Sequence, residues 1–149
     1  MAIQTVGIIG AGTMGNGIAQ ACAVSGINVV MVDISDAAVQ KGLATVAGSL
    51  DRLIKKEKIS EADKAAALSR IKVSTSYDDL KAAQLVIEAA TENYDLKVKI
   101  LKQVDALVAP EVIVATNTSS ISITQLAAAT QRADRFIGMH FFNPVPMMA

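Results

Sequence analysis

Short apolar runs alternate with longer amphipathic segments along the whole chain. The runs are rich in Val, Ile and Leu and lack the regular polar positions of a half-exposed strand, which is typical of strands buried on both faces of a parallel sheet. They predict strands at 3–9, 27–32, 71–74, 85–89, 112–115 and 136–140. The segments between them predict helices at 13–25, 36–58, 60–69, 93–108 and 122–129. This alternation predicts an α/β fold with a doubly wound, mostly parallel sheet in a single domain.

Residues that begin or end helices fall at the predicted boundaries. Ser35 is a suitable N-cap for the long second helix, and Gly26 ends the first. Ser60 with Asp63 three residues later fits an acidic variant of the capping box. In the segment 93–108 we expect one apolar face, made of Leu96, Ile100, Val104 and Leu107.

Composition narrows the class of protein. The chain has 149 residues, the size of one domain. Lys and Arg total 14, as do Asp and Glu, which argues against a nucleic-acid partner bound through bulk positive charge. Hydrophobic residues make up 52%, enough for a core, yet no apolar stretch is long enough to predict a membrane span. A single cysteine, Cys22, inside the first predicted helix, suggests a structural role and a reducing, cytoplasmic compartment.

A glycine-rich turn follows the first predicted strand and opens the first predicted helix. The segment 10–15 reads GAGTMG and matches the G-x-G-x-x-G pattern in the context that gives it meaning. Gly10 allows the tight turn, Gly12 lets a pyrophosphate approach the backbone, and Gly15 lets the helix pack close to the strand. The free N–H groups at the start of the helix, which include those of Thr13 and Met14, then bind the phosphates.

Asp33 lies at the end of the second predicted strand, about 20 residues after the glycines, where a carboxylate binds the ribose hydroxyls of a dinucleotide. It would repel a 2′-phosphate, and no Arg or Lys lies between Asp33 and Gln40 to offset that repulsion. The sequence therefore predicts a Rossmann-type NAD site rather than an NADP site. The alternative is a glycine-rich turn with an unrelated surface aspartate.

Polar clusters follow the later predicted strands, at 90–93, 116–120 and 140–143. The carboxyl ends of parallel strands share one edge of the sheet, where ligands of open α/β sheets bind. His140, the single histidine, lies there and can take a hydroxyl proton at neutral pH during oxidation of an alcohol. Glu88 and Glu92 are candidates to orient it. The alternative is a packed or surface histidine with no catalytic role.

Four segments together resemble the 3-hydroxyacyl-CoA dehydrogenase family. They read VGIIGAGTMG at 6–15, EAATEN at 88–93, NTSS at 117–120 and HFFNPVP at 140–146. The last is the most specific, because many dehydrogenases share the glycine turn. The resemblance covers essentially the whole chain, and it implies reversible oxidation of a short-chain (S)-3-hydroxyacyl-CoA with NAD as cofactor.

The resemblance also implies roles for individual residues. His140 matches the catalytic base, and Ser119 matches a serine that binds the substrate oxygen and touches the cofactor. Glu92, Lys97 and Asn143 match positions that contact NAD. Two further residues, Ser49 and Lys56, match positions that contact coenzyme A. The basic run at 51–58 would then serve a phosphorylated ligand, where it otherwise reads as a solvated helix end. No metal ion is implied.

Two parts of the family pattern are missing from this sequence. The glutamate that pairs with the catalytic histidine lies beyond the last residue, and so does a helical domain with further substrate contacts and the dimer interface. The apolar segment 144–149 supports the expectation that these residues are the first domain of a longer, homodimeric protein. We expect the 149 residues alone to bind NAD with very weak turnover.

Two other functions stay open at this point. A dinucleotide-binding module without catalysis would need the glycine turn and Asp33, but not the pair of His140 and Ser119. Another hydroxyacid dehydrogenase would share the glycine turn but would not bind coenzyme A. Competition by free coenzyme A, sensitive to Lys56→Glu, separates the last from the family reading.

Overall fold

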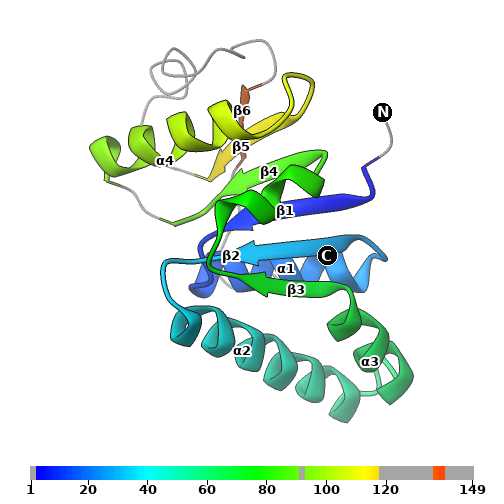
Figure 1. Cartoon of the computed structure of the whole chain (residues 1–149). Coiled ribbons are helices and arrows are strands. Elements are labelled where there is room, and N and C mark those ends of the chain that lie inside the picture. The colour runs from blue at the N-terminus through cyan, green and yellow to red at the C-terminus, as the bar shows by residue number, and fades with distance from the viewer. Residues whose placement is uncertain (1–2, 91–92, 118–135, 140–149) are drawn as a thin grey trace.

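The computed structural model describes residues 3–90, 93–117 and 136–139, and the elements alternate between strand and helix as expected (Figure 1). The predicted helix at 122–129 lies outside these residues. The elements are β1 (Thr5–Ile9), α1 (Thr13–Val24), β2 (Asn28–Val32), α2 (Asp36–Lys55), α3 (Glu61–Ser69), β3 (Ile71–Ser74), the 3-10 helix η1 (Tyr77–Ala82), β4 (Leu85–Glu88), α4 (Tyr94–Leu107), β5 (Ile113–Asn117) and β6 (Phe136–Met139).

The described strands form one sheet in the order β3-β2-β1-β4-β5-β6, and every neighbouring pair is parallel. The order reverses between β1 and β4, because the chain first builds outward to β3 and then crosses back. In open parallel sheets, ligands bind at the carboxyl ends of the strands beside such a switch point. The doubly wound fold is confirmed.

Alternate residues of the central strands β1, β2, β4 and β5 face two separate cores. Val6 and Ile8 of β1 pack in the core beneath α1, α2 and α3, whereas Ile9 packs in the core shared with η1 and α4. Gly7 faces η1, where a Cβ atom would lie 2.6 Å from the Leu80 side chain. Both faces of the sheet are therefore covered, which explains why the strands read as continuous apolar runs.

The predicted caps are confirmed. The Ser35 hydroxyl accepts a hydrogen bond from the Ala38 N–H, and Ser60 and Asp63 form the reciprocal capping box that begins α3. Hydrogen bonds from Ser60 lower the pKa of the Asp63 carboxyl. The long helix ends at Lys55 rather than at residue 58, and the chain reverses at Glu57, whose φ is 59°.

One local prediction was wrong, and one short element was not predicted. The segment 77–82 forms η1, which apolar periodicity cannot reveal in so short an element. The buried face of α4 is rotated from the predicted one, because Leu96 is 48% exposed. The residues of α4 and its C-cap that are buried against the sheet are Lys97, Ile100, Leu101, Val104 and Val108. Because Lys97 is a charged residue within the buried face of α4, the apolar pattern of the sequence does not show where that face lies.

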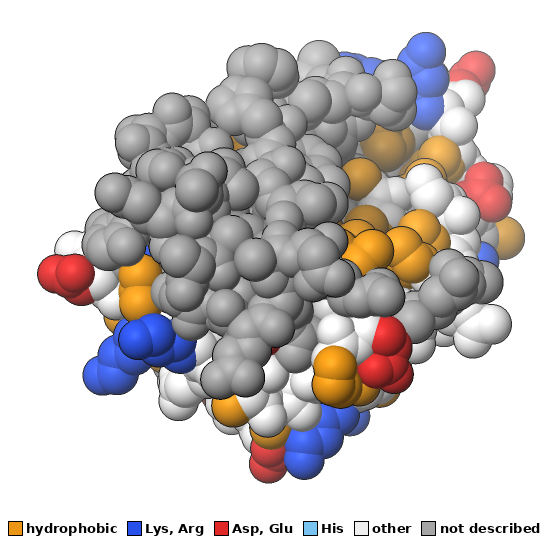
Figure 2. Space-filling model, turned by 90° about the horizontal axis from the view of Figure 1, so that it is seen from above, with side chains coloured by type: hydrophobic (Ala, Val, Ile, Leu, Met, Phe, Trp, Pro, Cys, Tyr) orange, Lys and Arg blue, Asp and Glu red, His pale blue; other side chains and the backbone are white. Residues whose placement is uncertain are grey.

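Charged side chains of both signs are visible among the described residues on one face of the molecule (Figure 2). Figure 2 shows their basic and acidic side chains in small separate groups on the face seen from above, rather than in a field of one sign. This agrees with the equal numbers of basic and acidic residues in the sequence. No described helix combines the length and the low polarity that crossing a membrane demands.

Candidate functional site

The glycine turn connects β1 to α1 at the switch point, and each glycine is explained by its surroundings. Gly10 has φ = +109°, and a Cβ atom there would lie 2.9 Å from the Ala89 carbonyl oxygen. A Cβ atom on Gly15 would lie 1.7 Å from the Gly10 carbonyl oxygen, so α1 could not begin so close to the strand. At Gly12 a Cβ atom would meet no described atom within 4 Å. The turn is therefore tightly fixed at Gly10 and Gly15 and open at Gly12, as a phosphate-binding turn requires.

Asp33 follows β2 and lies directly against this turn. Its Oδ2 accepts a hydrogen bond of 2.8 Å from the Ala11 N–H, and its Oδ1 accepts one of 2.6 Å from the Ile34 N–H. These bonds fix the plane of the carboxylate and leave further lone pairs for ribose hydroxyls. The Ile34 side chain is 91% exposed beside it, an apolar surface next to a polar site.

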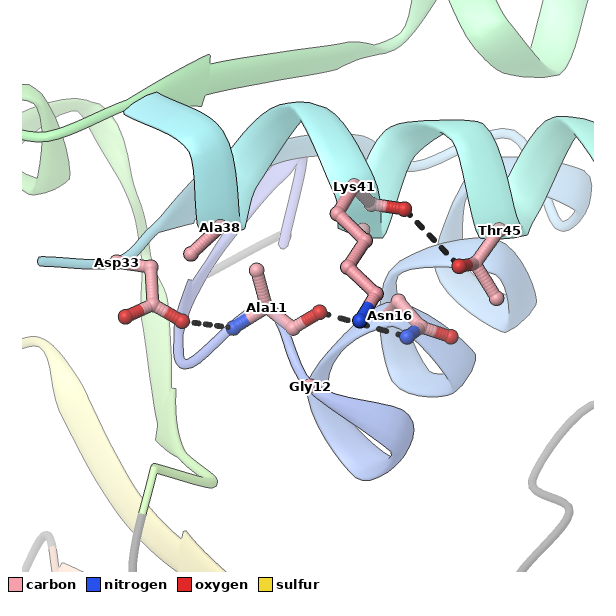
Figure 3. A pocket seen from close by; sticks show the side chains of 8 residues that line it. Ala11, Gly12, Asn16, Asp33, Ala38, Lys41 and Thr45 are labelled. Atoms are coloured by element: carbon pink, nitrogen blue, oxygen red, sulfur yellow. Dashed lines mark hydrogen bonds between the residues drawn. The ribbon is translucent and has the colours of Figure 1, made fainter. Parts of the chain in front are cut away.

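A pocket of about 300 Å³ opens between the turn, the end of β2 and the first turns of α2 (Figure 3). Gly12 and Asp33 line it, together with residues that the sequence analysis did not select: Ala11, Asn16, Ala38, Lys41, Gly42 and Thr45. The lining residues that belong to α2 lie three or four positions apart, on one face of the helix. This spacing is the sequence signal that could have identified them. The packing is close, since a Cβ atom on Gly42 would lie 2.7 Å from the Ala11 carbonyl oxygen.

A buried polar cluster lies at the same edge of the sheet, beneath the ends of β4 and β5. Lys97, Glu88 and Thr116 are each 0% exposed. The Lys97 ammonium pairs with Glu88 Oε1 and donates a hydrogen bond of 3.0 Å to Thr116 Oγ1, which itself donates one of 2.7 Å to Glu88 Oε1. Glu88 Oε2 accepts a hydrogen bond of 2.8 Å from the Ala90 N–H. The cluster thus joins α4, both strands and the start of the loop after β4.

Tyr77 extends the polar environment toward β2. Burial of its ring raises the pKa of the phenol, and the negative charges of Asp33 and Glu88 raise it further. Its packing against the core of η1 and α4 keeps the ring half-buried. Burial has the same effect on Cys22, since desolvation raises the pKa of its thiol and favours the protonated form. This supports a structural role for that side chain.

The two residues matched to coenzyme A lie farther along α2. Ser49 is half-buried and Lys56 is exposed at the C-cap of the helix. Neither lines the pocket beside Asp33. Their spacing of seven residues places them on one side of the helix, so a single extended ligand can reach both.

Four selected residues, Glu92, Ser119, His140 and Asn143, lie outside the described residues, and their predicted roles stay predictions. The strands that lead to three of them are described. β5 ends at Asn117 and β6 at Met139, and these two residues are partners in adjacent parallel strands. The carboxyl ends of β5 and β6 therefore lie at the same edge of the sheet as the glycine turn.

The described residues fit a dinucleotide. They supply an open glycine position, the N-terminus of α1, whose first N–H groups have no acceptor within the helix, and a fixed carboxylate for ribose. Among these residues no group of three or more His, Cys, Asp or Glu side chains is arranged to hold a metal ion.

Comparison with known proteins agrees with this site. The family model of the 3-hydroxyacyl-CoA dehydrogenase NAD-binding domain matches residues 5–149. The 3-hydroxybutyryl-CoA dehydrogenase of Bradyrhizobium diazoefficiens is 51% identical over 146 residues, which are 98% of this chain and 50% of that protein. The fatty acid oxidation complex subunit alpha of Acinetobacter baylyi is 41% identical over 98% of this chain and 20% of its own length.

A solved structure gives the same result. The (S)-3-hydroxybutyryl-CoA dehydrogenase of Ralstonia eutropha is 82% identical and superposes with a TM-score of 0.96, over 97% of this chain and 51% of that one. The chain therefore spans about half the length of these two 3-hydroxybutyryl-CoA dehydrogenases. It belongs to the family of NAD-binding domains of 3-hydroxyacyl-CoA dehydrogenases.

Proposed function

We propose that this chain is the cofactor-binding part of an enzyme that oxidises a short-chain (S)-3-hydroxyacyl-CoA reversibly to the 3-ketoacyl-CoA with NAD. The observation that carries the proposal is the juxtaposition of an open glycine position, Gly12, with the fixed carboxylate of Asp33 at the sheet's switch point. Relatives named 3-hydroxybutyryl-CoA dehydrogenase support the choice of substrate.

The glycine turn and Asp33 bind and orient the cofactor. The N–H groups at the start of α1, including those of Thr13 and Met14, donate to the pyrophosphate, and the helix dipole favours its negative charge. Asp33 accepts hydrogen bonds from the adenosine ribose, and Ile34 offers an apolar surface for the adenine ring. When bound, NAD supplies the acceptor for the hydride that leaves the substrate carbon.

The chemistry falls to residues that follow β5 and β6. His140 takes the proton of the 3-hydroxyl group as general base. Ser119 donates a hydrogen bond to the substrate oxygen and touches the cofactor. Glu92 and Asn143 contact NAD. Lys97 matches another such position, and from its buried place it holds Glu88 and Thr116 together.

Coenzyme A binds along α2. Ser49 donates a hydrogen bond to it, and Lys56 meets one of its phosphates as a point charge. We place the rest of the active site, with the partner glutamate of His140 and the dimer interface, in the part of the relatives that this chain does not span. The 149-residue chain alone then binds NAD with little turnover, as one part of a cytoplasmic homodimer.

The experiment has a binding arm and a catalytic arm. Calorimetry should show NADH binding to the 149-residue chain, and Asp33→Asn should weaken it at least about tenfold because a charged acceptor is lost. Asp78→Asn, on the exposed start of η1, is the matched control. Absence of NADH binding to the unaltered chain would contradict the proposal.

The catalytic arm uses the full-length protein with acetoacetyl-CoA and NADH, followed by loss of nicotinamide absorbance. His140→Ala should lower kcat by at least about a hundredfold, within the range for loss of a general base. An unchanged rate would remove His140 as the base. Binding of NADH without any turnover of 3-ketoacyl-CoA would favour a module without catalysis.

A further inference from the structure

The pocket beside Asp33 contains a positive charge that an NAD site does not require. Lys41 lines it together with Asp33 and Gly12, and its side chain extends toward the glycine turn (Figure 3). The ribose of NAD presents only neutral hydroxyl groups there. A cation in this position matches a phosphate group instead.

The backbone beneath Lys41 is held in place. Gly42, the next residue, packs so closely on the glycine turn that a Cβ atom there would lie 2.7 Å from the Ala11 carbonyl oxygen. The Thr45 hydroxyl donates a hydrogen bond of 2.9 Å to the Lys41 carbonyl oxygen. Lys41 therefore reaches the pocket although it lies eight positions after Asp33 along the sequence, because α2 turns it back over the site.

The charged groups around Lys41 leave its ammonium available to bind a phosphate. Asp33 is the acidic side chain among the residues that line the pocket, and both of its oxygens accept backbone N–H groups. The ion pairs found within 3–90, 93–117 and 136–139 join Lys64 to Asp51, Lys72 to Asp79 and Lys97 to Glu88, and Lys41 takes no part in them.

We propose that Lys41 is a latent phosphate-binding residue, so that the carboxylate of Asp33 alone makes this pocket reject the 2′-phosphate of NADP. The inference rests on the proposed placement of the adenosine ribose at Asp33. A phosphate on the ribose 2′-oxygen meets the Asp33 carboxylate, whose repulsion outweighs the attraction of Lys41. Without that negative charge, the same phosphate meets only Lys41 and neutral polar groups.

The test measures NADH and NADPH affinity by calorimetry in four variants of the 149-residue chain. Asp33→Asn removes the charge and keeps an acceptor for the Ala11 N–H, and Asp33→Ser removes the side chain from the ribose. Each should lower the Kd for NADPH at least about tenfold, which is the gain in affinity expected from one charge-assisted contact between lysine and phosphate. Adding Lys41→Met to Asp33→Asn should reduce that gain, leaving only the part that comes from the lost repulsion, whereas adding Lys81→Met, an exposed lysine of η1, should preserve it in full. Added salt should reduce the gain, because screening weakens the contact between lysine and phosphate.

The outcomes separate the inference from the proposed function. If neither Asp33 variant changes NADH affinity, the placement of the ribose is wrong and the inference fails with it. If NADH affinity falls but NADPH affinity does not rise, or rises equally with Met at position 41, the cofactor site stands and the role of Lys41 is overturned. A rise in NADPH affinity that depends on Lys41 supports the inference.

Discussion

The ammonium of Lys97, in the first turn of α4, and the carboxylate of Glu88, the last residue of β4, form an ion pair with no solvent contact. Thr116 completes their hydrogen bonding from β5. Removing two charges from water is costly, and the pair offsets that cost only while both partners and their hydrogen bonds are present.

Loss of one partner should therefore be more damaging than loss of both. We expect Lys97→Met to lower the free energy of unfolding by about 3–5 kcal/mol, because Glu88 would be left as a buried charge. The double variant with Glu88→Leu should recover a large part of this loss. Urea denaturation measures both, and a Lys97→Met variant as stable as the parent chain would contradict the assigned pair.

The contact between α2 and the glycine turn predicts an effect on ligand binding. Gly42→Ala places a methyl group 2.7 Å from the Ala11 carbonyl oxygen, so the turn must shift and NADH binding should weaken. Gly48→Ala on the same helix is the control, because its Cβ atom meets nothing within 4 Å. That change should stabilise α2 by about 0.5–1 kcal/mol and preserve NADH affinity. Equal NADH affinity in the two variants would refute the contact.

Tyr77 predicts a stability effect at alkaline pH. Its pKa is raised in the folded chain, so as pH rises the unfolded chain loses the phenolic proton first. The contribution of Tyr77 is present below the ordinary phenol pKa of about 10 and is lost as pH rises toward the folded-state pKa. The stability difference between the parent and Tyr77→Phe should shrink over that interval in urea titrations. Spectrophotometric titration should also show Asp33→Asn lowering the phenol pKa, and no such change would contradict the proximity of the two groups.

Cys22 should react slowly while the chain is folded. Burial raises the pKa of its thiol, and the thiolate is the reactive form. We expect labelling by an aromatic disulfide at pH 8 to be at least about tenfold slower in the native chain than in urea. Equal rates would mean that the thiol is accessible and that the face of α1 that contains Cys22 is not packed against the core as described.

The sequence predicted most of the fold because its local signals and its buried pattern agree. The glycine turn, Asp33 and the Ser60–Asp63 capping box each depend on residues close together in the chain, and their geometry is as expected. The face of α4 was mispredicted because Lys97 is a charged residue at a core position. Only a partner distant in sequence, Glu88, makes its burial possible.

The lining of the pocket likewise depends on residues that the sequence pattern alone does not bring together. No Arg or Lys lies between Asp33 and Gln40, and Lys41 is the residue that follows. Helical geometry and the close approach of Gly42 bring Lys41 to the pocket, and neither is visible in a linear window.

Calorimetric titration of NADH into the Gly12→Val variant tests the dinucleotide site most directly. A side chain at position 12 meets no described atom within 4 Å, so the variant should unfold at the same urea concentration as the parent. The valine would nevertheless occupy the space where the pyrophosphate approaches the backbone, and NADH binding should be lost. Binding of NADH to a folded Gly12→Val chain with the affinity of the parent would show that the cofactor lies elsewhere.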